Sequence, residues 1–335
     1  MLGLLSRGSV RVVLGLLVSA VFIYLTLSRV DLALLGDALG RVQPAGLFVA
    51  VGLVAVETAL RAKRWHLLLQ PVSPTRYRSA LAYLCIGYLA NAILPARLGD
   101  LTRAYLAGGA LGIARMGVLG TILVERLSDG LFILGAVAVL GVVVAGGGSL
   151  ATTAAGLGVI AIGGIAGLAF LVVVARRAGV HETRVGRVVS DILARLAVGA
   201  VALRRPATLA AVIGLTILPF AVGIVTFTVV ARAVGVDLTP AQAALAYGAV
   251  SLSFSIPAAP GSVGTYEFVG VTVLTAYGVT PEVALATVLL VHVLVTVSTS
   301  VAGLVAAWQL HFRVGAIADT ARGTGAGAPV EADVP

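Results

Sequence analysis

An apolar segment with an interruption in its middle constrains this chain more than any other feature. From Tyr88 to Tyr105 the sequence reads YLANAILPARLGDLTRAY, so an apolar helix breaks at Pro95 and Gly99 and then resumes. Three charged residues surround the break: Arg97, Asp100 and Arg103. The chain as a whole is 59% hydrophobic and 11% charged, whereas soluble domains carry about 25% charged residues. The composition therefore predicts an all-α polytopic membrane protein.

Sparse cysteines and histidines exclude several kinds of site. The single cysteine, Cys85, excludes a disulfide within the chain, and the four histidines are scattered, which argues against a metal site. The sequence contains no Walker A, zincin or nucleophile-elbow motif, so we expect neither an enzyme nor a cofactor. The net charge of +9 does not indicate a nucleic-acid partner, because the arginines cluster at the ends of apolar segments.

Apolar segments that are long enough to cross a bilayer divide the chain. Six spans are predicted, at 10–28, 44–62, 113–145, 150–175, 207–231 and 282–310. The basic connections 61–78 and 176–205 belong in the cytoplasm by the positive-inside rule, which also places both chain ends there. The bias toward Ala, Gly, Val and Arg is typical of a GC-rich prokaryote, so we expect the cytoplasmic membrane of such a cell.

With this orientation, two further apolar segments must begin and end on the same side. Residues 79–109 start and finish in the cytoplasm, and residues 240–280 start and finish outside. Helix breakers interrupt both segments, at Pro95, Gly99, Pro257, Pro260, Gly261 and Gly264. We therefore predict two re-entrant hairpins that enter from opposite faces. Because non-helical backbone at membrane depth needs surrounding protein or a water-filled cavity, the hairpins are expected to line a cavity.

The order of span, span, hairpin and span occurs twice within one transmembrane domain, residues 1–313. The halves, about 10–146 and 150–312, have opposite orientations, which predicts an inverted repeat of the kind that transporters use. Residues 183–205 form either an amphipathic helix on the cytoplasmic face or a plain connecting helix. The tail 314–335 is expected to be disordered. Gly163-x-x-x-Gly167 is compatible with a homodimer face.

Ionisable residues near the first break are candidate binding residues. Arg97 and Arg103 can bind a lipid phosphate, because guanidinium groups match phosphate oxygens. Alternatively, they form salt bridges to Asp100, Glu125 or Asp129. Insertion of such a residue into a membrane costs roughly 2.5–3.5 kcal/mol, so these side chains must face the cavity or one another.

The remaining charged residues of the predicted spans have similar alternatives. Glu125 and Asp129 either receive a cationic headgroup or a proton, or they only neutralise Arg126 and Arg97. Glu267 has no basic residue within one helical turn, so its partner must come from elsewhere in the fold. Glu57 and Arg61 are expected to pair along one helix, with Arg64 as a headgroup anchor and Trp65 at the membrane interface.

Three motifs together resemble the signatures of a known family. They are Asn91-x-x-Leu94-Pro95-x-Arg97-x-Gly99-Asp100-x-x-Arg103, Glu125-Arg126-x-x-Asp129 and Pro257-x-x-Pro260-Gly261-x-x-Gly264-x-x-Glu267. In this order they are similar to the lysylphosphatidylglycerol synthase transmembrane family, also called flippase-like integral membrane proteins, over roughly residues 10–312. The resemblance implies a domain that moves lipids across a membrane. Bifunctional members also carry a large C-terminal aminoacyl-transfer domain, which the short tail after residue 313 does not provide, so synthase activity is not expected.

The function that we expect is therefore lipid transport, with membrane lipids as partners and the substrate bound at the motif residues and Arg64. The headgroup would belong to a phospholipid, an aminoacylated phospholipid or a lipid-linked saccharide. One alternative is a membrane-embedded transferase for lipid or polyprenoid substrates. Another is an accessory subunit of a glycosyltransferase or a lipid-synthesis enzyme.

Overall fold

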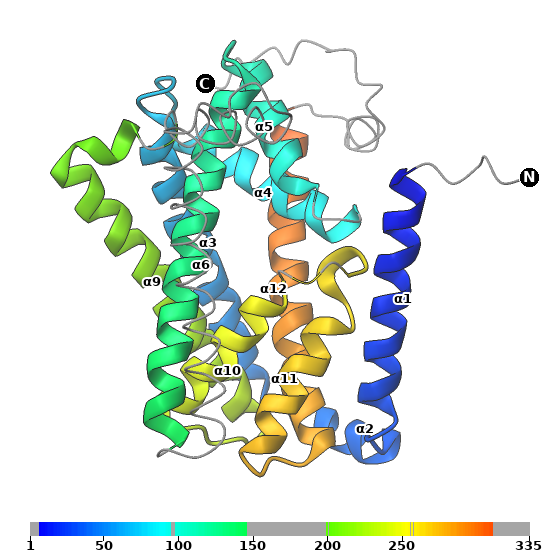
Figure 1. Ribbon diagram of the computed structural model, residues 1–335. Helices are drawn as coiled ribbons and strands as arrows, with labels where there is room; N and C mark the ends of the chain where they lie inside the picture. Colours follow the sequence, from blue (N-terminus) through cyan, green and yellow to red (C-terminus); the bar gives the residue numbers. More distant parts are fainter. Residues whose placement is uncertain are drawn as a thin grey trace, which may run out of the picture.

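The computed structural model describes residues 7–94, 98–145, 199, 201–254, 256 and 258–310. Helices account for the secondary structure of these residues, and no strand occurs among them, which confirms the predicted all-α class (Figure 1). The elements are α1 (Arg7–Leu27), α2 (Leu32–Gly40), α3 (Pro44–Leu69), α4 (Tyr77–Ile93), α5 (Gly99–Ala110), α6 (Arg115–Ala145), the 3-10 helix η3 (Val201–Arg204), α9 (Pro206–Ala233), α10 (Pro240–Ser253), the 3-10 helix η4 (Pro260–Ser262), α11 (Thr265–Ala276) and α12 (Pro281–Gln309).

Three of the described helices, α3, α9 and α12, are long and apolar enough to cross a membrane. Helices α1 and α2 meet at an angle of 84° and would supply a fourth crossing if this bent pair is one span. The described residues thus support a multi-pass membrane protein but not the predicted number of six spans. The predicted span 150–175, the pair Gly163 and Gly167, most of the segment 183–205 and the tail 314–335 lie outside the described residues.

One connection contains a helix that was not predicted, and one predicted segment boundary was wrong. The connection 29–43 contains helix α2, which begins where the Asp31 carboxylate accepts the backbone N–H groups of Ala33 and Leu34. Helix α3 does not end near residue 62 but continues through the basic stretch to Leu69. Arg64 and Trp65 are buried there against neighbouring helices, so neither is a headgroup anchor or an interfacial residue.

Two helical hairpins enter the bundle from opposite ends (Figure 1). Helices α4 and α5 form the first hairpin, and α10, η4 and α11 form the second. The tips meet inside the bundle, because α4 contacts η4. This arrangement agrees with the expected pair of broken segments. The inverted repeat remains a prediction, because much of the second half's beginning is outside the described residues.

Glycine at position 99 allows the arms of the first hairpin to approach closely. A Cβ atom added to Gly99 would lie 2.0 Å from the Gly87 carbonyl oxygen and 2.5 Å from Cγ of Asn91. The Asn91 amide oxygen also accepts the Gly99 N–H at 2.8 Å. Pro95 and Arg97, which belong to the same predicted break, lie outside the described residues.

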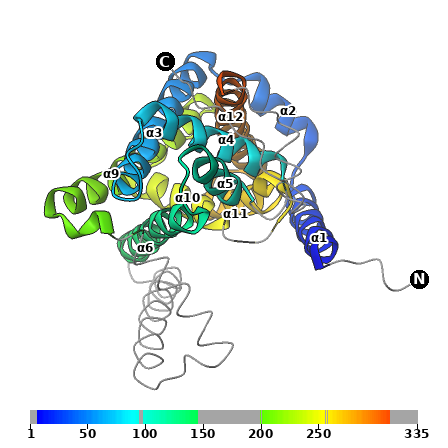
Figure 2. The ribbon, with the colours of Figure 1, turned by 90° about the horizontal axis from the view of Figure 1, so that it is seen from above.

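The second hairpin turns through backbone conformations that favour glycine. Gly261 and Gly264 have φ angles of 70° and 92°. A Cβ atom added to Gly264 would lie 2.7 Å from the Ser19 carbonyl oxygen of α1. Pro260 begins η4 between these breaks, and Pro257 lies outside the described residues. The tip therefore combines a tight turn with close packing on α1, which lies at the edge of the bundle (Figure 2).

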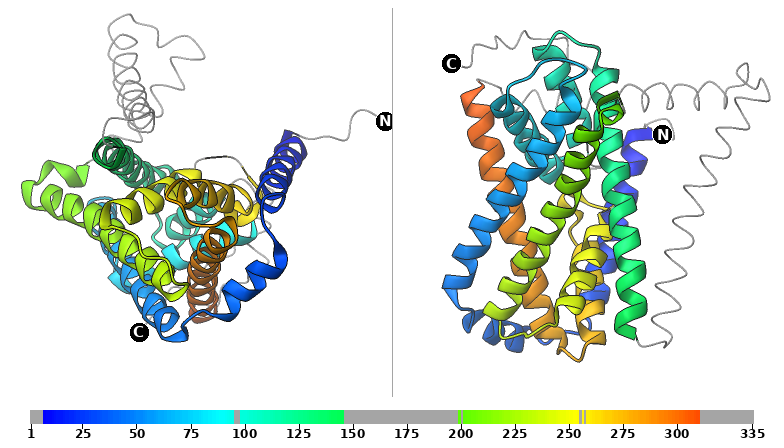
Figure 3. Two further views of the ribbon diagram at one scale, coloured as in Figure 1. Left: turned by 90° about the horizontal axis from the view of Figure 1, so that it is seen from below. Right: turned by 90° about the vertical axis from the view of Figure 1, so that its left-hand side faces the viewer.

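Each hairpin has an apolar cluster of its own. The first cluster joins α4 and α5 to parts of α3, α6 and α12, and the second joins α10 and α11 to parts of α9 and α12. Helices α3 and α9 lie side by side along the bundle (Figure 3). Helix α12 thus contributes to both clusters and runs past both hairpin tips.

Candidate functional site

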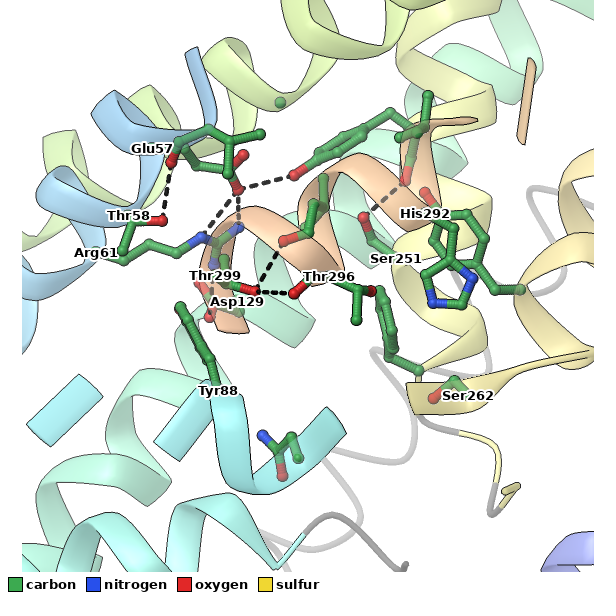
Figure 4. Close-up of a pocket in the computed structure, with 18 of the residues that line it drawn as sticks. Glu57, Thr58, Arg61, Tyr88, Asp129, Ser251, Ser262, His292, Thr296 and Thr299 are labelled. Atoms are coloured by element: carbon green, nitrogen blue, oxygen red, sulfur yellow. Dashed lines mark hydrogen bonds and ion pairs between the residues drawn. The ribbon is translucent and has the colours of Figure 1, made fainter. Parts of the chain in front are cut away.

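A cavity of about 380 Å³ lies between the two hairpins (Figure 4). Its walls come from α3, α4, α6, α9, α10 and α12, together with the tip of the second hairpin. Glu57 and Arg61 lie on one side of the view, and His292 and Ser262 lie on the opposite side. The wall also contains hydroxyl and aromatic side chains, namely Tyr88, Phe132, Phe220, Tyr247, Ser251, Tyr266, Thr296 and Thr299. The cavity therefore offers both charged and apolar contacts.

Arg64 is the centre of a buried ion-pair network beside this cavity. Its guanidinium group donates to both carboxylate oxygens of Asp129, at 2.5 and 2.9 Å, and to Glu125 at 3.1 Å. It also donates to the Thr216 hydroxyl at 3.1 Å. The side chain is 0% exposed. Arg64 therefore holds two helix α6 acids in place instead of reaching a lipid headgroup at the surface.

Arg103 approaches the same network from the first hairpin. It donates to Glu125 at 2.5 Å, and its guanidinium group lies 4.3 Å from the centre of the Trp65 ring. The Trp65 indole N–H in turn donates to the Thr121 hydroxyl. Of the two alternatives for Arg103, the structure thus shows the salt bridge. Glu125 receives one arginine from α3 and another from α5.

Two further ion pairs are more accessible. Arg126 donates to both oxygens of Asp100 at 2.8 and 2.9 Å, and these side chains are 34% and 31% exposed. Arg61 donates to Glu57 at 2.7 and 3.0 Å, and the Tyr247 hydroxyl donates to the same Glu57 oxygen. The expected pair of Glu57 and Arg61 is therefore present. Both pairs extend toward Asp129, at 3.6 Å from Arg61 and 4.0 Å from Arg126.

The four arginines and the four acids of this network have no net formal charge. The arginines are Arg61, Arg64, Arg103 and Arg126, and the acids are Glu57, Asp100, Glu125 and Asp129. Full pairing is what a low-dielectric environment requires, because an isolated buried charge is unfavourable. A ligand phosphate that binds an arginine here therefore competes with a carboxylate for the charge of that arginine.

The tip of the second hairpin carries a separate polar pair. Glu267 of α11 lies 2.5 Å from the Nδ1 atom of His292 of α12, and the His292 Nε2 atom lies 2.8 Å from the Gly261 carbonyl oxygen. The other Glu267 oxygen accepts the Gly264 N–H at 2.6 Å. Glu267 thus finds its partner on another helix, and the partner is a histidine.

Sequence reasoning did not identify several residues of the cavity. His292 was treated as one of four scattered histidines, although an ionisable residue inside an apolar helix is itself a signal of a functional site. Tyr247, Thr296 and Thr299 have no motif that distinguishes them from packing residues. Among the described residues, no group of three or more His, Cys, Asp or Glu side chains could hold a metal ion.

Comparison with known proteins identifies the family. Residues 12–303 match the family described as "Lysylphosphatidylglycerol synthase TM region". The chain belongs to this family. The resemblance inferred from the three motifs is thereby confirmed, and the family places the chain among membrane proteins.

A curated relative outside the synthases gives a second comparison. The chain is 31% identical to "Glycosyltransferase AglD" of Haloferax volcanii over 342 aligned positions, gaps included, and the alignment covers 88% of this chain and 53% of that protein. The chain thus spans about half the length of this relative. No solved structure matches the chain.

Proposed function

We propose that this member of the lysylphosphatidylglycerol synthase TM family is a lipid transporter of the flippase type. The polar headgroup would pass through the cavity between the hairpins while the acyl chains stay in the bilayer. One observation carries this proposal: a cavity with accessible arginines lies where two broken helices meet. Its volume of about 380 Å³ is within the usual range of roughly 300–1,000 Å³ for ligand sites.

The exposure of the arginines suggests different roles for them. Arg126 and Arg61 line the cavity and are partly exposed, whereas Arg64 and Arg103 are enclosed by protein. We assign phosphate binding to Arg126 and Arg61. A phosphate would replace Asp100 on Arg126, because both groups present two oxygens to a guanidinium group. Arg64 and Arg103 would then position the acids of α6 and take no direct part in binding.

The partial exposure of Arg126 supports this route. The pair of Arg126 and Asp100 is already partly exposed, so an exchange of partners leaves no deeply buried charge alone. We further propose the cytoplasmic membrane of a prokaryote as the location, with both described chain ends facing the cytoplasm.

A liposome assay tests the proposal. Fluorescent lipids with different headgroups are incorporated in both leaflets, and dithionite bleaches the label that reaches the outer leaflet. We expect selective movement of a lipid with an anionic phosphate, with at least a tenfold slower rate in Arg126→Gln. Arg232→Gln is the matched control, because Arg232 is 65% exposed and pairs only loosely with Asp237 at 3.6 Å.

Folded protein that moves none of the phospholipids, aminoacylated phospholipids or polyprenyl-phosphate lipids would overturn the transport proposal. If Arg126→Gln and Arg232→Gln slowed lipid movement equally, Arg126 would not be part of the binding site. Gel filtration and thermal unfolding of each variant establish that a slow rate is not caused by misfolding.

The similarity to AglD supports a second candidate function. That relative is named a glycosyltransferase, and this chain matches about half of its length. The chain would then serve a glycosyltransferase that acts on lipid-linked saccharides, as an accessory subunit or as the membrane part of the enzyme. Sugar transfer to a polyprenyl-phosphate lipid that requires this chain, together with no lipid movement by the purified chain, would favour this candidate.

A further inference from the structure

Glu267 and His292 form a buried pair outside the arginine network. Their side chains are 10% and 7% exposed, and they join the first turn of α11 to the middle of α12. His292 contacts Glu267 through Nδ1 and the Gly261 carbonyl through Nε2. Both ring nitrogens thus have an oxygen partner at hydrogen-bond distance.

The number of protons in this pair follows from its partners. A backbone carbonyl can only accept, and an ionised carboxylate can only accept. A neutral imidazole carries one N–H group and one acceptor nitrogen, so an ionised Glu267 beside a neutral His292 leaves two acceptors facing each other. One additional proton, on either the ring or the carboxylate, satisfies both contacts. This conclusion does not depend on which tautomer is assigned.

We propose that Glu267 and His292 together bind one proton, and that this proton holds the tip of the second hairpin against α12. The proton is shared between the carboxylate and Nδ1, while the Nε2–H group donates to Gly261. Its release would leave one of the two contacts without a hydrogen. The tip would then detach from α12 on the side that faces the cavity.

The position of the pair makes it an effective clamp. Gly261 and Gly264 are the two positive-φ glycines of the tip, and each has a backbone group bonded to this pair. The Tyr266 ring stacks on His292 with a centroid distance of 4.3 Å. On the far side, the Ala259 N–H donates to the Ser19 hydroxyl of α1 at 2.8 Å. Loss of the proton would therefore weaken the attachment of the tip to α12.

Other titratable groups near the pair do not supply this proton in the observed arrangement. Glu267 has hydrogen bonds to His292 and Gly264, and His292 to Glu267 and Gly261. The other titratable or charged side chains that line the cavity with the pair are Tyr266 of α11, Tyr247 of α10, Tyr88 of α4, Glu57 and Arg61 of α3, and Arg126 and Asp129 of α6.

Protons can reach the pair through the cavity, because His292, Gly261 and Ser262 belong to its wall. The link to function rests on the proposed lipid transport, which this site would make proton-linked. A proton would favour the attached tip, and its release would favour the detached tip. Rising pH therefore shifts the equilibrium toward the detached tip.

Electron paramagnetic resonance tests the proton site without any transport measurement. The single cysteine is replaced by Cys85→Ala, and a nitroxide is attached at Val263→Cys, a position that is 46% exposed and adjacent to the tip. In liposomes between pH 5 and pH 9, we expect a slow component from the attached tip and a fast one from the detached tip. Their ratio should change by up to tenfold per pH unit, as the release of one proton requires.

Two variants at the pair have opposite expected results. Glu267→Gln supplies an amide N–H to Nδ1 and an amide oxygen to the Gly264 N–H, so it should hold the tip and keep the slow spectrum at every pH. His292→Leu removes both contacts and should give the fast spectrum at every pH. Glu282→Gln is the matched control on α12, because Glu282 accepts the Asp31 N–H at the helix start, and it should titrate like the parent.

A parent spectrum that does not change with pH would overturn the proton site, and so would a Glu267→Gln variant that titrates like the parent. A pH-dependent spectrum without movement of any lipid would overturn the transport proposal and leave the proton site standing. A pH-dependent spectrum with lipid movement that is equally fast at pH 5 and pH 9 would overturn the coupling between them.

Discussion

Removal of either partner of the buried salt bridge between Arg103 and Glu125 should strongly lower stability. The two side chains are 1% and 2% exposed, and their closest atoms are 2.5 Å apart. Arg103 has no other hydrogen-bond partner among the described residues for its Nε and Nη1 atoms. Removing one member of a buried pair typically costs about 3–5 kcal/mol, because the remaining charge stays buried without compensation. We therefore expect Glu125→Gln and Arg103→Gln each to lower the free energy of unfolding by about 3–5 kcal/mol.

A double-mutant cycle in bicelles measures this interaction. The variant with both substitutions should be more stable than the sum of the single effects predicts, by roughly 0.5–3 kcal/mol, because no uncompensated charge from this pair remains. Asp100→Asn is the matched control: it also removes a carboxylate from an arginine, but its pair is about one-third exposed, so the expected loss is about 0–1 kcal/mol. The reasoning would be refuted if Glu125→Gln were as mild as Asp100→Asn, or if the two substitutions were additive.

Three further predictions concern packing and hydrogen bonds. Gly99→Ala should separate the arms of the first hairpin and lower the thermal midpoint, since the added Cβ would overlap the Gly87 carbonyl. Gly109 has open space around it, so Gly109→Ala should be neutral or slightly stabilising. A thermal scan in detergent compares the two variants. Asn91→Ala removes the acceptor of the Gly99 N–H and should lower the free energy of unfolding by about 1–3 kcal/mol. No measurable change would show that water replaces the amide. Tyr247→Phe removes one donor to Glu57 and should cost about 0.5–1.5 kcal/mol, with a larger loss indicating that the hydroxyl also orders the cavity wall.

The sequence alone predicted the helical class and the broken segments well. Apolar length identifies α9 and α12, and the Pro and Gly residues at 95–99 and 257–264 identify two hairpins, since neither residue type continues a helix. Charge in the sequence misled at α3, where Arg64, part of a basic stretch that looks like a loop, is a buried residue of the helix. A loop and a buried ion-pair helix have the same local composition, and only the acids of α6 distinguish them.

The candidate site was only partly predictable for a related reason. Motif residues such as Glu125, Asp129 and Glu267 are ionisable residues in apolar sequence, so their importance follows from the cost of burying charge. Their partners are far away in the chain: Arg64 is separated from Asp129 by 65 positions, and His292 from Glu267 by 25. No local pattern specifies such pairs, because they depend on how the helices are arranged around the cavity.

The shared position of α12 has a consequence for biosynthesis. It is the last of the described helices, yet it supplies part of the apolar packing around both hairpins. At about 5–20 residues per second, the first hairpin must therefore wait several seconds or more in the membrane before its packing is complete. During that interval its arginines and acids can already pair with those of α3 and α6. The early ion pairs would thus keep the unfinished first half in register until the final helix arrives.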